Sequence, residues 1–274
     1  MKGRLLNEPQ VAALVRMLVD TPVIFDVSVI DMGMQTVEAV VAHRDRQCVK
    51  LSESLGPEHK PELVAQIEIM KNRLAATSPQ LYVQSRMIFN LIWKSLQHST
   101  LLYSQRLPSE IGSASWMFDA KGRDKLTDWE DWWRSMMAPI LQSIGRRVPL
   151  IALTEGDYSF FDRSFQVETS PWFRDKFETD ETHGTSLGLV FSDFEFESGI
   201  NFGLEMVDVL TNAVRRALSG RFDESGWGEI SKLIPRMRDK HRVQLCSFVQ
   251  PNDSDLPYGA VIRKFDKYSK RLLI

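Results

Sequence analysis

Hydrophobic and polar positions divide the first hundred residues into one helix, one strand and a long helical region. Asn7 and Gln10 have the pattern of a capping box, and the apolar residues that follow at helical spacing predict a helix. Residues 23–31 are rich in Val and Ile and carry apolar residues on both faces, which predicts a buried strand. The helical pattern of residues 36–100 indicates a layer of helices before the next strand.

The middle of the chain alternates between strand patterns and one aromatic helix. Residues 113–119 alternate between apolar and polar side chains, which makes them the clearest strand of this part. Weaker strand candidates are residues 101–105, 149–153 and 187–194. Thr127 and Glu130 form a second capping box, and Trp and Met residues follow at helical intervals. Such a stripe can stack nucleobases, but it is more typical of a helix packed into the core.

An amphipathic helix is predicted within residues 199–220. Asn201 is suited to cap its start, and Gly220 can end it in a left-handed conformation. Its polar side consists of Glu205, Asp208, Thr211, Asn212, Arg215 and Arg216. Glu205 and Asp208 lie three positions apart, so their carboxylates are neighbours on the helix. This pattern is typical either of a solvated face of mixed charge or of a cleft in which a cation or proton neutralises the pair.

Composition places the chain among globular proteins. Its 274 residues are 43% hydrophobic and 26% charged, a length at the upper edge of one domain. No apolar run approaches the ~18 residues that cross a membrane, and the first residues carry no signal-peptide pattern. Cys48 and Cys246 form no metal or redox motif and are expected to be reduced thiols. We therefore expect a cytoplasmic protein that does not contact a membrane.

Charge is distributed unevenly although the net charge is only −2. Residues 155–208 contain thirteen acidic and three basic residues, whereas residues 209–274 contain thirteen basic and seven acidic ones. The basic residues of this tail include Arg236, Arg238, Lys240, Arg242, Arg263, Lys264, Lys267 and Lys270. This asymmetry suits a cation site beside a phosphate-binding surface, and it suits two solvated faces without a role equally well.

Two aspartates close predicted strands, at the position where α/β folds place their sites. Asp31 ends residues 23–31, and Asp119 ends residues 113–119. If they converge with Asp208, their oxygens would suit Mg²⁺ or Mn²⁺, and paired ions about 3.5–4 Å apart cleave phosphodiesters. The alternative is that each aspartate only caps the turn that follows it.

Several segments resemble a bacterial protein family called domain of unknown function 3800. Residues 203–208 followed by residues 212–218 are similar to the carboxyl-terminal signature of the family, with Glu205 where Gln is commoner. Residues 116–121 resemble its acidic strand. Residues 156–161 and Gly226-Trp227 are similar to markers of one branch of the family. The similarity extends over most of the chain.

The resemblance implies a ribonuclease H-like α/β fold, a mixed sheet flanked by helices. The expected domain covers residues 1–220, with a helical insertion at about 34–100, and residues 221–274 form a C-terminal extension packed on it. The resemblance also implies catalytic carboxylates and bound Mg²⁺ or Mn²⁺. The expected catalytic residues are Asp119, Asp208 and Glu205, the expected metal ligands are Asp119, Asp208 and Asp31, and the expected phosphate-binding residues are Arg215 and Arg216.

One departure from the family leaves two functions open. Family members begin with a strand that carries Tyr-Ile-Asp-Glu-Ser-Gly, and no such strand opens this sequence. A two-metal site would then lack one ligand. The first hypothesis is a metal-dependent nuclease acting on RNA or DNA. The alternative is a catalytically inactive module of the same fold that binds nucleic acid or protein through its basic tail.

Overall fold

Helices predominate in the structure, and its strands are short. A computed structural model describes residues 6–53, 60–122, 127–169, 171, 174–175, 180, 182–236, 243–249 and 256–272. The α-helices are α1 (Glu8–Val19), α2 (Val37–Glu53), α3 (Pro61–Ala76), α4 (Pro79–Arg106), α5 (Asp128–Arg147), α6 (Ser159–Phe165), α8 (Leu187–Val190), α9 (Phe202–Leu218), α10 (Glu224–Trp227) and α11 (Gly259–Lys267). The 3-10 helices are η1 (Met32–Met34), η2 (Pro108–Gly112) and η3 (Gly228–Leu233). The strands are β1 (Ser28–Ile30), β2 (Ser115–Asp119), β3 (Gln166–Glu168), β4 (His183–Thr185), β5 (Asp193–Glu197), β6 (Pro235–Arg236), β7 (Gln244–Cys246) and β8 (Lys270–Arg271).

The strands pair as four separate two-stranded sheets within the described ranges. The pairs β1–β7, β2–β5 and β6–β8 are parallel, and β3–β4 is antiparallel. A mixed α/β class is therefore confirmed, but these residues do not form the single mixed sheet that was expected. Helices rather than further strands cover the apolar side chains, and of the strand predicted at residues 23–31 only Ser28–Ile30 pairs.

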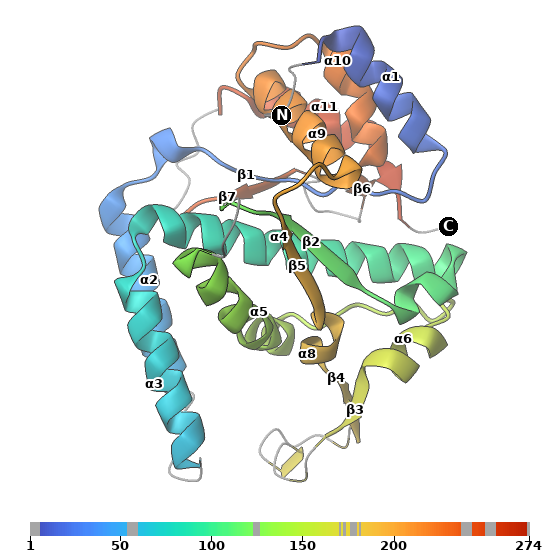
Figure 1. The fold of residues 1–274 in the computed structure, drawn as a ribbon. Coiled ribbons are helices and arrows are strands. Elements are labelled where there is room, and N and C mark those ends of the chain that lie inside the picture. Colours follow the sequence, from blue (N-terminus) through green and yellow to red (C-terminus); the bar gives the residue numbers. More distant parts are fainter. Residues whose placement is uncertain are drawn as a thin grey trace.

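Two hydrophobic cores lie on either side of β1 and β7 (Figure 1). One core surrounds α4 and α5 and includes side chains of β2, β5, α6 and α8. Trp132, Trp133, Met136 and Met137 are buried in it, which confirms that the aromatic stripe is core. The second core joins α1 and α9 to α10, η3 and α11. The elements that follow residue 220 thus share their core with the first helix of the chain.

Three of the weaker strand predictions are wrong. Residues 101–105 continue α4, where Leu101 is buried and the Ser104 hydroxyl donates to the Leu101 carbonyl at 3.2 Å. A short apolar run does not by itself distinguish a strand from a buried helix. Residues 149–153 form no strand, and residues 187–194 begin with α8, so that β5 starts only near their end.

Helix α9 has the caps that its sequence predicts. The Asn201 side chain accepts a hydrogen bond from Leu204 N at 3.2 Å. Gly220 has a φ of 67°, the left-handed conformation that glycine adopts without strain. The buried residues on its apolar side are Leu210, Ala213, Val214 and Ala217. The exposed residues of its polar side, which are Glu205, Asp208, Thr211 and Arg215, are thereby turned away from the second core.

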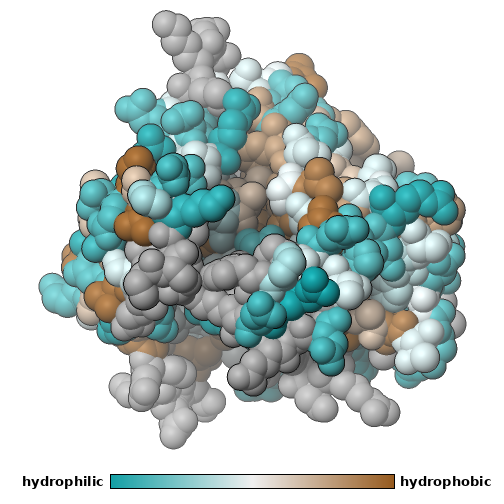
Figure 2. All heavy atoms as spheres, turned by 90° about the horizontal axis from the view of Figure 1, so that it is seen from below, coloured by the Kyte–Doolittle hydropathy of each residue, from teal (hydrophilic) through white to brown (hydrophobic). Residues whose placement is uncertain are grey.

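The surface of the molecule is mixed in character. In Figure 2, which views the molecule from below, hydrophilic residues predominate, and hydrophobic residues border a hollow near the middle of this face. Cys48 and Cys246 are both free thiols, in agreement with the sequence. Within the described ranges, no helix combines the length and the apolar character that crossing a membrane requires.

Glu130 fastens the start of α5 to the end of β2 from a buried position. Lys121 N donates to Oε1 of Glu130 at 2.8 Å, and Thr127 N and Oγ1 donate to Oε2 at 2.6 and 2.7 Å. Burial tends to raise the pKa of this carboxyl group, but the donors outweigh burial and hold the pKa of Glu130 below its usual value. The predicted capping box is thus confirmed, and Lys121 extends it.

Replacing Glu130 with glutamine should lower the free energy of unfolding by about 1 kcal/mol at neutral pH. The amide is neutral and offers one oxygen in place of two. Because the pKa of Glu130 is lowered in the folded protein, its contribution is complete above the unfolded pKa of about 4.3 and is lost as the pH falls toward the folded value. Urea unfolding at pH 7 and pH 3 should show the difference between wild type and variant shrinking with acid; a difference that grows would contradict this role.

Candidate functional site

The parallel pairing of β2 with β5 gathers carboxylates on one exposed side. Ser115 pairs with Asp193, Met117 with Glu195, and Asp119 with Glu197. We call Asp119, Asp193, Glu195 and Glu197 the acidic face. Asp119 and Glu197 are direct cross-strand neighbours at the carboxyl ends of the two strands, which is where α/β proteins place their sites.

The period of the two strands explains why Asp119, Asp193 and Glu195 are exposed and why Glu197, on the same side, is only half-buried. Trp116 and Phe118 alternate with the exposed residues of β2, and Phe194 and Phe196 do so in β5. These four aromatic side chains pack against the core around α4 and α5, where the Phe118 and Phe194 rings lie 4.8 Å apart. Successive side chains of a strand point to opposite faces, so burying the aromatic residues directs the acidic ones outward.

Helix α9 follows β5 directly and contacts β2. Glu205 and Asp208 are exposed on its first two turns (Figure 1 shows the approach of α9 to β2 and β5). The structure therefore brings the helix that bears Asp208 to the strand pair that bears Asp119. Glu197, which the sequence analysis did not single out, joins them through the strand register. Its Oε1 accepts a hydrogen bond from Gly199 N at 2.6 Å.

No basic residue neutralises these carboxylates within the described ranges. Asp119, Asp193, Glu195, Glu205 and Asp208 form no ion pair with any described residue. Like charges directly opposite each other on a sheet are destabilising. The acidic face therefore attracts cations and repels phosphate unless a cation lies between them.

The fit of these residues to a divalent cation is partial. Among the described residues, no group of three or more His, Cys, Asp or Glu side chains is arranged to hold a metal ion. The cross-strand pair Asp119 and Glu197 nevertheless matches the donor set of Mg²⁺, which often takes one or two carboxylates and completes its shell with water and substrate phosphate. These residues therefore offer a cation at most two carboxylates and do not form a closed all-protein cage.

Asp31 caps the turn that follows it, which was the alternative to a role as a metal ligand. Its side chain caps η1 by accepting a hydrogen bond from Gly33 N at 2.9 Å. It follows β1, which pairs with β7, whereas Asp119 belongs to the separate pair β2–β5. Burial, with a smaller effect from Asp31, raises the pKa of Tyr258. Tyr258 of the C-terminal segment is thus a neighbour of Asp31. The role of Asp31 as a metal ligand stays a prediction.

The two arginines of α9 differ in their surroundings. Arg216 donates to the Leu6 carbonyl at 2.7 Å, and its guanidinium lies 4.1 Å from the centre of the Phe222 ring. The first contact connects α9 to the segment before α1, and the second connects it to the segment that follows α9. Arg215 is exposed and donates to Asn212 Oδ1 at 3.1 Å. Arg215 is therefore the better placed of the two for phosphate, and Arg216 has a packing role.

The described part of the basic tail is largely engaged. Lys264 pairs with Glu224, and Lys270 donates to the carbonyls of Thr21 and Val23 at 3.3 Å each. Lys267 lies 5.1 Å from the Tyr268 ring centre. Arg238, Lys240 and Arg242 lie outside the described residues. These contacts weaken the hypothesis that the whole tail is a free phosphate-binding surface.

Two polar features escaped the sequence analysis. One is a cavity with a basic mouth among α2, α3, α4 and α5. The other is the buried Asp26 carboxylate, whose Oδ1 lies 2.7 Å from His98 Nδ1 and 3.7 Å from Lys94 Nζ. Lys94 and His98 are four positions apart on α4, a spacing that was visible in the sequence, but nothing local identified Asp26 as their partner.

Comparisons with known proteins give no identification. The chain matches no protein family model, no curated protein and no solved structure.

Proposed function

We propose that the acidic face and α9 form a divalent-cation-dependent phosphodiester-cleaving site that acts on RNA or DNA. The observation that carries the proposal is the cross-strand pairing of Asp119 with Glu197, two carboxylates that form no ion pair with any described residue. The helix that bears Asp208 reaches the same strand pair. A parallel strand pair followed by a helix that bears carboxylates on its first two turns is also what supports the ribonuclease H-like part of the proposal, together with the family resemblance.

In this proposal each residue has a separate task. Asp119 and Glu197 hold Mg²⁺ or Mn²⁺, which when bound neutralises phosphate charge and activates water. Asp208 and Glu205 extend the negative surface along α9, and Arg215, two turns beyond Asp208, binds a neighbouring phosphate of the substrate. Without the cation, the acidic face repels nucleic acid, so binding as well as cleavage should depend on divalent ions.

Asp119→Asn should lower cleavage by about 10²-fold or more, as the loss of one electrostatic group in an active site does. Labelled single- and double-stranded RNA and DNA are incubated with the protein in Mg²⁺, in Mn²⁺ and in EDTA. Glu197→Gln and Asp208→Asn should reduce the rate as well. Glu168→Gln, which changes an exposed carboxylate on β3, should leave it unchanged. Equal cleavage by the wild type and Asp119→Asn, or full activity in EDTA, would rule out this site.

A catalytically inactive binding module is the second candidate. The lack of a third ligand among the described residues favours it. In that case the wild type binds nucleic acid or a protein without cleaving it under any metal condition. Binding that weakens steeply with salt would indicate phosphate contacts, whereas a flat salt response would indicate a protein partner.

A further inference from the structure

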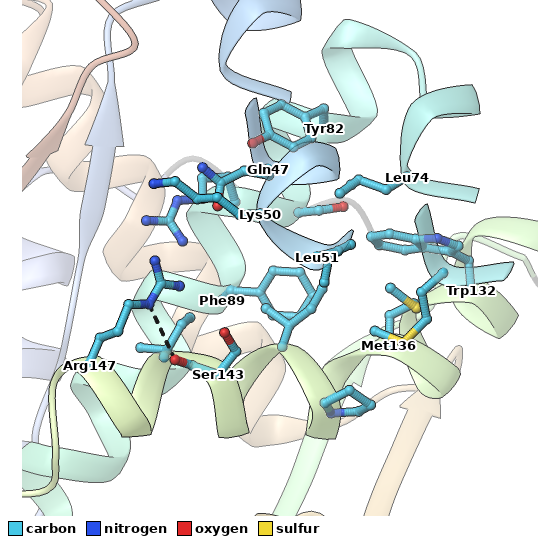
Figure 3. Close-up of a pocket in the computed structure, with 16 residues that line it drawn as sticks. Gln47, Lys50, Leu51, Leu74, Tyr82, Phe89, Trp132, Met136, Ser143 and Arg147 are labelled. Atoms are coloured by element: carbon cyan, nitrogen blue, oxygen red, sulfur yellow. Dashed lines mark hydrogen bonds between the residues drawn. The ribbon is translucent and has the colours of Figure 1, made fainter. Parts of the chain in front are cut away.

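A cavity of about 460 Å³ lies between α2, α3, α4 and α5. Its volume is in the range of pockets that hold small molecules. Figure 3 shows that its two ends differ in character: Lys50 and Arg147 lie at one end, and Leu74, Trp132 and Met136 lie at the other. The cavity is thus amphipathic along its length.

The charged residues that line the cavity are all cations. They are Lys50, Arg86 and Arg147, and no carboxylate of the described residues lines the cavity with them. None of the three forms an ion pair within the part of the chain that the structure describes. Arg86 is half-buried, and burial, with a contribution from Arg147, lowers its pKa although Tyr82 opposes the shift. A half-buried guanidinium without a carboxylate is unfavourable unless an anion accompanies it.

His43, which lies outside the cavity lining, is affected by the same positive charges. Its Nδ1 lies 2.6 Å from the Tyr82 hydroxyl oxygen. Burial lowers the pKa of His43, and the positive charges of Arg86, Arg46 and Lys50 lower it further. The excess of positive charge at this end therefore extends beyond the residues that line the cavity.

Ser85 adds a hydrogen-bonding group to the cavity wall. It lines the cavity, is only 2% exposed, and precedes Arg86 in α4. Its hydroxyl oxygen is buried and has no hydrogen-bond partner in the structure. Buried hydroxyl groups are normally satisfied, so this group is suited to donate to an oxygen atom of a bound molecule.

We propose that this cavity binds a phosphate monoester that carries a single alkyl chain. Arg86, Lys50 and Arg147 would contact the phosphate, and Ser85 would donate to one of its oxygens. A phosphate monoester carries about −1.5 to −2 charges at pH 7, which matches three uncompensated cations better than the single charge of a carboxylate does. The alkyl chain would lie along the apolar wall toward Met136.

The apolar end favours an alkyl chain over a nucleobase. Leu74 and Met136 offer no hydrogen bonds there, and the indole N–H of Trp132 is the polar group that this end supplies among its labelled residues. A base edge carries several donors and acceptors, and burying them without partners is unfavourable. An alkyl chain has no such groups.

Isothermal titration calorimetry tests the proposal with dodecyl phosphate below its micelle concentration. Laurate, dodecanol, inorganic phosphate and adenosine monophosphate serve as comparators. We expect dodecyl phosphate to bind about tenfold or more tightly than dodecanol, because its contacts to Arg86 are charge-assisted, and more tightly than laurate. Inorganic phosphate and the nucleotide should bind weakly. Equal binding of dodecanol, tighter binding of laurate or of the nucleotide, or no binding of dodecyl phosphate would overturn the assignment.

Variants separate binding at this site from binding elsewhere. Arg86→Gln should lower the affinity for dodecyl phosphate about tenfold or more. Ser85→Ala should lower it about three- to tenfold through loss of one hydrogen bond. Arg16→Gln, an exposed position near the end of α1, is the matched control and should change nothing. If Arg86→Gln does not fold, Lys50→Gln replaces it, since Lys50 is exposed. Unchanged affinity in both Ser85→Ala and the cation variant would refute the site.

Discussion

Replacing Asp26 with alanine should lower the free energy of unfolding by about 3–5 kcal/mol, the usual effect of removing one partner from a buried charge pair. The Asp26 side chain is 2% exposed, and those of His98 and Lys94 are 5% and 17% exposed. Burial lowers the pKa of Lys94, and the nearby Asp26 charge opposes that shift. Without the carboxylate, both nitrogen groups stay in a poorly solvated site with less compensation.

Asp26 lies where the two cores meet, so replacing it also removes a contact between them. Phe25 and Val27, its neighbours in sequence, are buried in the core of α1 and α9. Asp26 points the opposite way, to His98 on α4. The alternation within three residues thus joins the second core to the helix at the centre of the first.

Urea unfolding of three variants tests this role. Glu68→Ala is the control, because the side chains of the Lys71–Glu68 pair at 3.2 Å are 34% and 45% exposed, and the pair should be worth less than about 1 kcal/mol. Asp26→Asn keeps an oxygen atom for His98 but no charge. Its loss of unfolding free energy should lie between those of Asp26→Ala and Glu68→Ala. The difference in unfolding free energy between the wild type and Asp26→Ala should become smaller at high pH. Loss of the Asp26 charge lowers the pKa of Lys94 in the folded variant further, and a folded protein with such a lysine gains stability as the pH rises and the lysine loses its proton. A cost for Asp26→Ala no larger than that for Glu68→Ala would contradict the assignment.

Local patterns predicted the helices well and the sheets poorly. The caps at Asn201 and Thr127 depend on groups within three residues of each other, and both were predicted from spacing alone. The sheets depend on pairings such as that of Ser28 with Gln244, which no local pattern specifies. Helix α4 extends over residues that were predicted as a strand, because a short segment that begins with Leu-Leu-Tyr fits both elements.

The candidate site was predictable residue by residue but not as a group. Asp119 and Asp208 were expected from a strand end and a helix face, and the structure brings their elements into contact. Glu197 was not expected, because its pairing with Asp119 follows only from the strand register. Arg216 was expected to bind phosphate, but its contact to Leu6 crosses most of the chain. Chemistry that depends on distant partners requires the fold.

The polar stripe along α4 is visible in the sequence, but it was not used for a prediction. Arg86, Asn90, Lys94 and His98 recur every four residues, which places them on one side of a helix. The part of that side from Asn90 to His98 meets the segment of Asp26 and β7, where Asn90 Nδ2 lies 3.8 Å from the sulfur of Cys246. The spacing predicts a stripe, but only the structure shows that the stripe is covered.

Replacing Trp133 with alanine should cost about 3–5 kcal/mol of unfolding free energy. Trp133 is 1% exposed and stacks on Phe89 of α4 with ring centres 4.5 Å apart and an angle of 18°. It also contacts Phe118 of β2, at 5.9 Å between ring centres. Its removal therefore leaves a cavity where α4, α5 and the strand pair of the candidate site meet.

The conservative variant Trp133→Phe distinguishes the loss of ring packing from the removal of the indole N–H group. The Trp133 indole N–H is buried without a partner in the structure, so phenylalanine removes an unsatisfied donor while keeping a ring on Phe89. We expect Trp133→Phe to cost less than about 2 kcal/mol. Phe202→Ala, at a residue that is 73% exposed, should change stability by less than about 0.5 kcal/mol. Urea midpoints at constant m-value measure all three, and a Trp133→Ala midpoint equal to that of Phe202→Ala would show that this aromatic cluster does not hold α5 and β2 together.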